Sequence, residues 1–500
     1  MSSPWPSAEN MQYEKHSLFF EGHLVIMDSK TNNAESGEMD MENVAGQDYQ
    51  TNISWLFIPF RLESEVPCAK TIASLASSGW LPQKMANSYL LKYISDKYDS
   101  SDEENCCCFH FRLRDEMKEK TGISREGEWK GSKNWYYQGK LCEFRFHLQD
   151  AHLFFFRSGI GIIAFQVHTD SGEPKYISTL LFHLKRVSVI QIRADREGTE
   201  DTTLLDIARG LVGTLGSAGA PAFFEFLNPG EERANVLCYL ELPPKADYSS
   251  ELFYLRHCYG DSYRESRDED AEKKEVLSLV SGFTWGISAE ALVCIAAGTQ
   301  EQKSFRESAF FSNFNQNYLL LYVLLLHQKA KLYHFLTKIG IGNSNSIKAL
   351  EAYQQELYEF ETDYVFSTVS EVPQYQIVYE RVEEAFALRK LFDDVHYPLK
   401  YLSIVRQREI ENTEAKRKKK TSTALATLSL LSLISAFQSV RSLLTENFEY
   451  SLCTPFLKGA TIFAILLLMA ALISLLIVFI ARPVWQFISR KIKGQKHDKK

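Results

Sequence analysis

The sequence predicts an α+β cytoplasmic domain followed by a long stalk helix and two C-terminal transmembrane helices. Three patterns predict this fold class. Apolar and polar residues alternate in short segments between residues 51 and 300, as in half-buried strands. Apolar residues recur at threes and fours over 373–420, as along one face of a helix. Two uncharged apolar runs follow, at 421–440 and 459–481, and about 20 such residues suffice to cross the hydrocarbon core of a bilayer.

The cytoplasmic domain is predicted over 51–300, behind a polar N-terminal segment at 1–50 that we expect to be partly mobile. Cys106–Leu113 and Cys142–Leu148 each alternate large apolar side chains with His, Arg or Glu. Leu153–Val167 has the pattern of a hairpin with its turn near its first third. Helical stretches are expected near Cys68–Trp80 and Met85–Tyr98, so the domain belongs to the α+β class.

A helical subdomain is predicted over 301–372, and the stalk helix over 373–420. Tyr318–Leu326 is apolar on all sides, but nine residues are too few to span a bilayer, so we expect a buried core helix there. Pro373 suits a first helical turn. The 48 residues of the stalk would form a rod of about 70 Å. Because no helix stop separates the rod from the first apolar run, we expect it to continue into the membrane and to transmit movements of the cytoplasmic domain.

Composition argues against several classes of function. The net charge is −7 although the C-terminal end is basic, so the soluble part is acidic and no nucleic-acid partner is expected. The nine cysteines show no metal-ligand spacing, and Cys106, Cys107 and Cys108 are consecutive, so no metal site is predicted. The glycine-rich stretch 210–219 lacks the Gly-Lys-Ser/Thr ending of a phosphate-binding loop and is expected to be a flexible loop. No nucleophile–base pairing supports an enzyme, and no cofactor is assigned.

The flanking charges predict the orientation in the membrane. A basic cluster stands directly before the first apolar run: Lys416, Arg417, Lys418, Lys419 and Lys420. The tail at 482–500 is also basic, whereas the loop at 441–458 holds only Arg441 and Lys458. Lys and Arg gather on the cytoplasmic side of membranes. We therefore predict a multi-pass protein of the cell (inner) membrane, in contact with lipid, with both termini cytoplasmic and the loop outside.

A hydroxyl stripe distinguishes the first predicted span from an ordinary transmembrane helix. The spacings of seven, three, three and four between its serines predict one helix face: Ser422, Ser429, Ser432, Ser435 and Ser439. Leucine and isoleucine side chains are expected on other faces: Leu425, Leu428, Leu431 and Ile434. In lipid, such a stripe either hydrogen-bonds neighbouring helices or lines a water-filled pore.

The order of these parts, from α+β domain through helical region and stalk to two spans and a basic tail, resembles the CorA magnesium-transporter superfamily. The resemblance covers 301–500 well and the rest in outline. It implies a homo-oligomer, a pentamer in that family, around one pore lined by the first span. The transported ion would then be Mg²⁺ or another divalent cation, and the basic cluster would resemble the family's belt at the cytoplasmic membrane face.

One motif of that superfamily is absent. CorA-like transporters end the first span with Gly-Met-Asn, whereas this chain reads Ala-Phe-Gln-Ser-Val-Arg over 436–441. Gln438 and Ser439 are the polar residues that could take its place at the end of the pore. Glu446 and Glu449 in the predicted loop would attract cations at the outer mouth.

Three functions follow from these patterns. The first is a CorA-like oligomeric channel or transporter for metal cations, gated by its cytoplasmic domain. The second is a membrane effector on the same scaffold, opened by a nucleotide messenger in a type III CRISPR antiviral defence system. A ligand pocket within the cytoplasmic domain would favour the second. The third is a membrane-anchored interaction protein, which would tolerate changes in the serine stripe.

Overall fold

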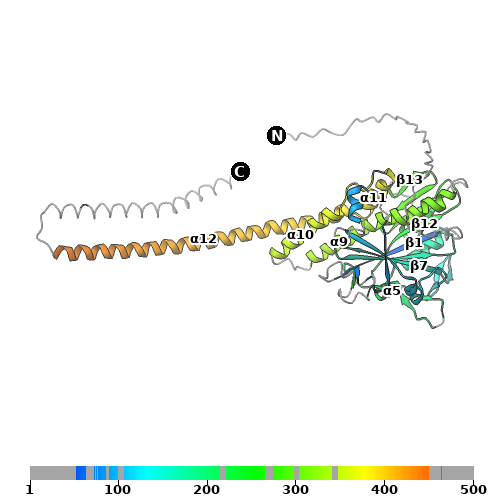
Figure 1. The fold of residues 1–500 in the computed structure, drawn as a ribbon, viewed down its shortest axis with the longest axis horizontal. Coiled ribbons are helices and arrows are strands. Elements are labelled where there is room, and N and C mark those ends of the chain that lie inside the picture. The colour runs from blue at the N-terminus through cyan, green and yellow to red at the C-terminus, as the bar shows by residue number, and fades with distance from the viewer. Residues whose placement is uncertain are drawn as a thin grey trace, which may run out of the picture. The chain divides into compact units, whose positions relative to one another are not determined.

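The computed structural model describes residues 52–62, 72–73, 75, 77–85, 89–98, 106–196, 198–213, 221–264, 274–297, 303–340, 347–449 and 463 (Figure 1). The predicted N-terminal segment, the second apolar run apart from Phe463, and the basic tail lie outside the described residues. The described residues divide into two units. Unit 1 holds those up to Phe155, Gly161–Val323 and Ser370–Ala385. Unit 2 holds Phe156–Ile160, Leu324–Val369 and the described residues from Phe386 onward.

Unit 1 is built on a mixed sheet. Its strands are β1 Asn52–Leu62, β2 Trp80–Gln83, β3 Cys108–Leu113, β4 Glu128–Gly131, β7 Arg145–Phe156, β8 Ile160–His168, β9 Gln191–Ala194, β10 Thr202–Thr203, β11 Pro221–Phe223, β12 Asn235–Glu241, β13 Val276–Val280, β14 Phe283–Ile287 and β15 Ala291–Ala296. The order is β10-β9-β4-β7-β8-β1-β12-β15-β14-β13, with β11 on β1, and β3 joining β2 to β7. β12 and β15 run parallel, whereas β1 and β12 are antiparallel. β5 (Trp135–Tyr137) and β6 (Lys140–Cys142) form a separate two-stranded sheet.

Helices connect and cover these strands. They are α2 Lys92–Ser95, η2 Asp96–Tyr98, α3 Asp115–Thr121, α4 Pro174–Leu184, α5 Leu204–Val212, α6 Ser249–His257, η4 Phe305–Phe310, α8 Phe311–Asn313, η5 Phe314–Tyr318, α9 Leu319–Gly340, α10 Ile347–Tyr364, α11 Pro373–Ala385 and α12 Leu388–Glu449. The segments η4 and η5 are π-helical, which periodicity in the sequence does not indicate.

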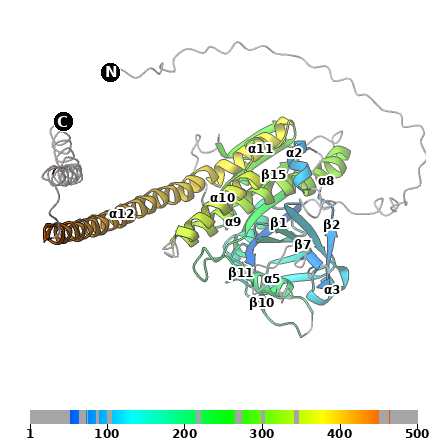
Figure 2. The same cartoon turned by 60° about the vertical axis from the view of Figure 1, so that its left-hand side comes forward.

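The sheet of unit 1 buries both faces. One face forms the main hydrophobic cluster with side chains of α4, α5 and α6, among them Leu181 and Leu211. The other face is covered by aromatic contacts from the η4–α9 segment. The Trp285 and Tyr318 rings lie 4.6 Å apart, and the Phe57 and Tyr322 rings lie 5.4 Å apart. Figure 2 shows α5 and α11 on opposite sides of the sheet. Burial on both faces explains why β1 is an almost continuous apolar run.

A β-bulge in β7 reverses which side chains face the main cluster. Leu148 lies opposite Val167 of β8, and Asp150 lies opposite Gln166, so Gln149 is the extra residue. Before the bulge the even-numbered Phe146 and Leu148 join the cluster, and after it the odd-numbered residues do. Because side chains alternate along a strand, one inserted residue turns Asp150 and the alternate residues after it to the opposite face.

Unit 2 is helical and is built around the part of α9 that begins at Leu324. Gln328 on α9 donates from its Nε2 to the Tyr364 carbonyl at the end of α10, 2.7 Å away. The ammonium of Lys329 lies 4.4 Å from the centre of the Phe386 ring, just before α12. Val395 and Leu399, near the start of α12, are buried. These contacts fix the first turns of α12 to the α9–α10 pair.

The prediction of a mixed α/β region and a long C-terminal helix is confirmed, and Tyr318–Leu326 is a buried helical segment as expected. The helix that begins at Pro373 differs from the prediction, because it ends at Ala385. Ala387 then adopts a left-handed backbone with φ +52°, which no α-helix can contain, and α12 starts anew at Leu388. The predicted separate strands at 142–148 and 153–156 are one strand, β7, joined through the bulge.

The end of the helix that contains the first apolar run also differs from the prediction. α12 continues through Pro398 and on to Glu449, so residues 441–449 of the predicted outside loop are helical. Its 62 residues give a length of about 93 Å. A Gly or Pro that could end the helix is absent between Lys400 and Glu449, which explains why the helix persists past the apolar run.

Candidate functional site

The predicted pore-lining residues all lie on α12. Ser422, Ser429, Ser432, Ser435, Gln438 and Ser439 are exposed within the single chain. Several hydroxyls donate to backbone carbonyls of their own helix: Ser429 to Leu425 at 2.8 Å, Ser432 to Ser429 at 3.0 Å, and Ser439 to Ser435 at 3.1 Å. Such bonds occupy the hydroxyl hydrogens and leave oxygen lone pairs as acceptors.

The hydroxyl stripe is less uniform than predicted. α12 is an α-helix, on which residues seven positions apart lie on the same face after two turns. Leu425 therefore shares a face with Ser432, and Leu428 shares a face with Ser435. The prediction that Leu425 and Leu428 lie on other faces is wrong for these two. The face is a mixture of hydroxyl and leucine side chains.

The charged residues predicted around the span occupy the expected positions along the chain. Lys416, Arg417, Lys418, Lys419 and Lys420 are exposed on α12 directly before the apolar run. Glu446 and Glu449 belong to the last turns of α12 rather than to a loop.

One helix in the described part of the chain is long and apolar enough to cross a membrane. It covers Leu388–Ser439 and contains an 18-residue window of mean hydropathy 1.3, none of which is buried. Large apolar side chains such as Leu428, Leu431 and Phe437 are more than half exposed. An exposed apolar surface of this length marks a contact with lipid or with another protein surface.

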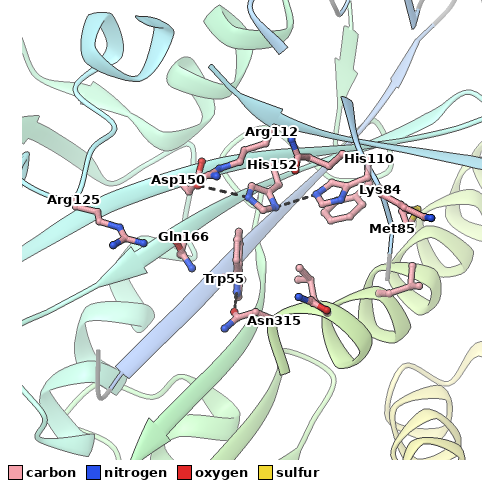
Figure 3. A pocket seen from close by; sticks show the side chains of 15 residues that line it. Trp55, Lys84, Met85, His110, Arg112, Arg125, Asp150, His152, Gln166 and Asn315 are labelled. Atoms are coloured by element: carbon pink, nitrogen blue, oxygen red, sulfur yellow. Dashed lines mark hydrogen bonds and ion pairs between the residues drawn. The ribbon is translucent and has the colours of Figure 1, made fainter. Parts of the chain in front are cut away.

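Unit 1 contains a polar cavity of about 640 Å³ that the sequence did not predict (Figure 3). Its lining residues come from β1, the end of β2, β3, β7, β8 and the η5–α9 segment: Trp55, Gln83, Lys84, Met85, His110, Arg112, Arg125, Asp150, His152, Phe154, Gln166, Asn315, Gln316, Leu319 and Leu320. We call this the β7 cavity. It lies on the sheet face opposite the main hydrophobic cluster.

The bulge in β7 creates this cavity. It turns Asp150, His152 and Phe154 away from the main cluster, where they meet the polar face of β3, His110 and Arg112. The rings of His110 and Phe154 stack with centres 4.4 Å apart. The strand pattern at 106–113 indicated the polar face of His110 and Arg112. The cavity residues of β7 lie after the predicted strand at 142–148, and only the change of register at the bulge turns them to the cavity side.

Asp150 is the buried anion of the β7 cavity. Its Oδ2 accepts from Arg112 Nε at 2.6 Å, and its Oδ1 accepts from Lys118 Nζ at 2.8 Å and from the Ala151 amide at 2.9 Å. Burial alone would raise the pKa of Asp150, but the electrostatic contact with His152 and the charged hydrogen bonds from Lys118 and Arg112 outweigh it and hold the pKa well below its usual range.

Two histidines continue from Asp150 across the cavity. His152 Nε2 lies 3.8 Å from Asp150 Oδ2, an electrostatic contact longer than a hydrogen bond. His152 Nδ1 and His110 Nε2 are 3.0 Å apart, within hydrogen-bond distance. Burial lowers the pKa of both rings, although Asp150 opposes the shift. A neutral pair must share one proton in this bond, and the nearby carboxylate favours N–H on Nε2 of His152, so Nδ1 accepts from His110.

The chemistry of the cavity favours binding of an anion over covalent catalysis. Among its described lining residues there is no hydroxyl or thiol nucleophile. Lys84 and Arg125 carry positive charge, and Arg112 shares Asp150 with Lys118. Within the described ranges, no group of three or more His, Cys, Asp or Glu side chains is arranged to hold a metal ion.

Unit 2 contains a second buried polar group, at the tip of the β7–β8 hairpin. Ser158 Oγ lies 2.6 Å from His327 Nε2, and the Phe156 ring stacks on His327 at 3.8 Å. Lys331 donates to the Ser158 carbonyl at 2.9 Å and to Glu356 Oε1 at 2.7 Å. Burial, with Lys331 nearby, lowers the pKa of His327 well below its usual value. Among the described residues no carboxylate contacts His327, because Glu356 holds Lys331 instead, so the arrangement differs from a catalytic triad. The group fixes the hairpin tip between α9 and α10.

Comparisons with known proteins found no similarity. No family model matches the chain, and neither the curated proteins nor the solved structures contain a significant match to it.

Proposed function

We propose that the chain is an oligomeric membrane channel or transporter for cations, Mg²⁺ or another divalent ion, gated by its cytoplasmic part. The observation that carries this proposal is the continuity of α12. One helix extends from buried contacts at Val395 and Leu399 through the basic cluster into the apolar window. A movement of the helices that hold its first turns is therefore delivered to the membrane segment without an intervening loop.

The exposed surface of α12 supports assembly from several copies. A lone helix with an unburied apolar window gains lipid contacts on all sides, but its serine and glutamine side chains gain nothing from lipid tails. In a ring of copies, the mixed hydroxyl–leucine face of each α12 would meet its neighbours and the central water, while the opposite face would meet lipid. Residues 459–481 would provide the second span, which places both termini in the cytoplasm.

A messenger-gated effector on the same scaffold is the second candidate. The β7 cavity favours it, because a cavity with surplus positive charge suits a small anionic messenger. In this alternative the open pore would pass ions with little selectivity, and permeabilisation of the membrane would be the function.

Ion flux through purified protein in liposomes tests these functions. Uptake of Mg²⁺ and of K⁺ is measured with and without a small-molecule extract of phage-infected cells. Selective Mg²⁺ flux without extract supports the transporter. Unselective flux only with extract supports the effector. Absence of flux under both conditions would refute both and leave a membrane-anchored interaction protein.

Variants of α12 then test the pore face. Ser432→Leu with Ser435→Leu should reduce flux roughly tenfold, the effect of about 1.4 kcal/mol added to the barrier. The single variant Ser432→Leu is compared with Thr423→Leu as its matched control, since Thr423 lies nine residues, or two and a half turns, from Ser432 on the opposite face. Equal flux in Ser432→Leu and Thr423→Leu, each assembled to the same size as the unmodified protein, would exclude the assignment of the pore face.

A further inference from the structure

The β7 cavity combines charge, space and hydrogen-bonding groups that a cation channel or transporter does not by itself require. We propose that it binds the phosphate group of a small phosphorylated molecule. An effect of this binding on channel gating would rest on the proposed channel function. Binding itself is measured without ion flux, so the binding proposal and the channel proposal can fail separately.

The charge of the cavity is positive in a protein whose net charge is negative. The cavity is lined by Lys84, Arg112 and Arg125, and Lys118 contacts Asp150 at 2.8 Å. Asp150 is the single carboxylate among the described lining residues, and both histidines are neutral at pH 7. The whole chain carries −7, so this local surplus is not a general property of the surface.

Two of the cations are available to a ligand. Lys84 and Arg125 are exposed, and neither makes a hydrogen bond or ion pair with another described residue. The Arg112 side chain is 45% exposed although its Nε is held by Asp150, so the rest of its guanidinium can donate to a second anion. Figure 3 shows Arg125 beside Gln166 at one side of the cavity and Lys84 beyond His110 at the other.

The framework of the cavity is rigid, which favours recognition over a passing contact. Asp150 holds Arg112 by accepting from its Nε, and His110 is held between Phe154 and His152. Trp55 donates from Nε1 to Asn315 Oδ1 at 3.0 Å, which fixes the opposite wall. A preformed site spends little of its binding energy on ordering its own side chains.

The chemistry of the lining favours a phosphate ester over a simple anion. The forked guanidinium of arginine fits two phosphate oxygens, and cations at both sides of the cavity suit a phosphate ester that carries more than one negative charge. A volume of about 640 Å³ exceeds the size of inorganic phosphate and lies in the range of sites for small organic ligands. The remaining lining supplies amides, Gln83, Gln166 and Gln316, for hydroxyl groups, and Met85 and Leu319 for an apolar part.

Calorimetric titration of the purified full chain in detergent tests the proposal. The probes are pyrophosphate, adenosine monophosphate, short-chain phosphatidic acid and, as a carboxylate of matched charge, succinate. We expect saturable binding of at least one phosphate compound and weaker binding of succinate. Binding of the lipid or of the soluble phosphates identifies the source of the phosphate group. Succinate binding as tightly as every phosphate compound, or no binding of any phosphate compound, would overturn the proposal.

Variants of the two available cations assign binding to the β7 cavity. Lys84→Gln with Arg125→Gln should weaken phosphate binding roughly tenfold or more, because each side chain would donate charged hydrogen bonds to the ligand. Lys140→Gln with Arg408→Gln removes the same two residue types at exposed positions outside the cavity. Phosphate binding that weakens equally in both double variants would overturn the assignment. Since neither pair takes part in a described internal contact, thermal unfolding of both should match the unmodified protein.

Discussion

Replacement of Asp150 by asparagine should destabilise unit 1 by about 3 kcal/mol. Asp150 is 5% exposed and Lys118 is 6% exposed, so the change leaves a buried ammonium without its main counter-charge. The asparagine oxygen can still accept from the Ala151 amide, and Arg112 is near enough to solvent to lose little. Removal of one partner of a buried pair costs about 3–5 kcal/mol, and we take the lower end because Asp115 still lies 3.4 Å from Lys118.

Thermal unfolding of the purified full chain in detergent at pH 7 measures this effect. A domain of this size loses roughly 2–4 °C of Tm per kcal/mol, so Asp150→Asn should lower Tm by roughly 6–12 °C. Asp115→Asn is the matched control, because Asp115 contacts the same lysine but its side chain is 93% exposed. It should change Tm by no more than about 2 °C, as an exposed pair contributes little.

A second substitution separates loss of the pair from a general disturbance. Lys118→Met in the Asp150→Asn background removes the unpaired buried charge and should recover part of the lost Tm. Two results would contradict a stabilising buried pair. One is an equal Tm for Asp150→Asn and Asp115→Asn. The other is that Lys118→Met lowers Tm in the Asp150→Asn background by as much as it does in the unmodified protein.

Three further predictions concern other parts of the molecule. Burial lowers the pKa of His183 and His257 from 6.5 to about 4, so between these pH values the unfolded chain binds more protons than the folded chain. Tm should therefore fall as pH drops from 6.5 toward 4, and a constant Tm over that range would contradict the burial of these rings. Lys331→Met should lower the free energy of unfolding by about 3 kcal/mol, because Lys331 is 3% exposed and donates to the Ser158 carbonyl. The exposed Lys400→Met should leave the denaturant midpoint unchanged, and equal midpoints for the two variants would contradict the proposed anchoring of the hairpin tip. Ala387→Gly should raise stability by about 0.5–1 kcal/mol, since φ +52° is strained for alanine, and a lower unfolding midpoint would show that this backbone conformation is not adopted in solution.

The elements that the sequence predicted share one property, a pattern that is complete within a single segment. The apolar run at Tyr318–Leu326 was predicted as a buried helix because its length excludes a span, and it lies buried in α9 and the turn before it. The long C-terminal helix followed from periodicity without a breaker over tens of residues. Composition and length suffice for such elements, because backbone hydrogen bonding inside a helix is local.

Boundaries and the cavity depended on interactions that the sequence does not display locally. Ala387 breaks the expected rod although alanine favours helices, so the residue type gave no sign of the break. The bulge at Gln149 has no marker such as glycine, and it becomes defined only when β7 pairs with β8. That single extra residue sets Asp150 and His152 against His110 and Arg112 instead of inside the apolar cluster.

The sequence by itself determined the acidic α/β region and the long C-terminal helix with its apolar window, because charge and hydropathy are properties of residue order. Tertiary structure decided the β7 cavity, the Asp150–Lys118 pair and the anchored hairpin tip. The physical reason is that burial makes a charge costly unless it is paired, and the pairing partners, such as Asp150 and Lys118, are brought together only by strand register and packing.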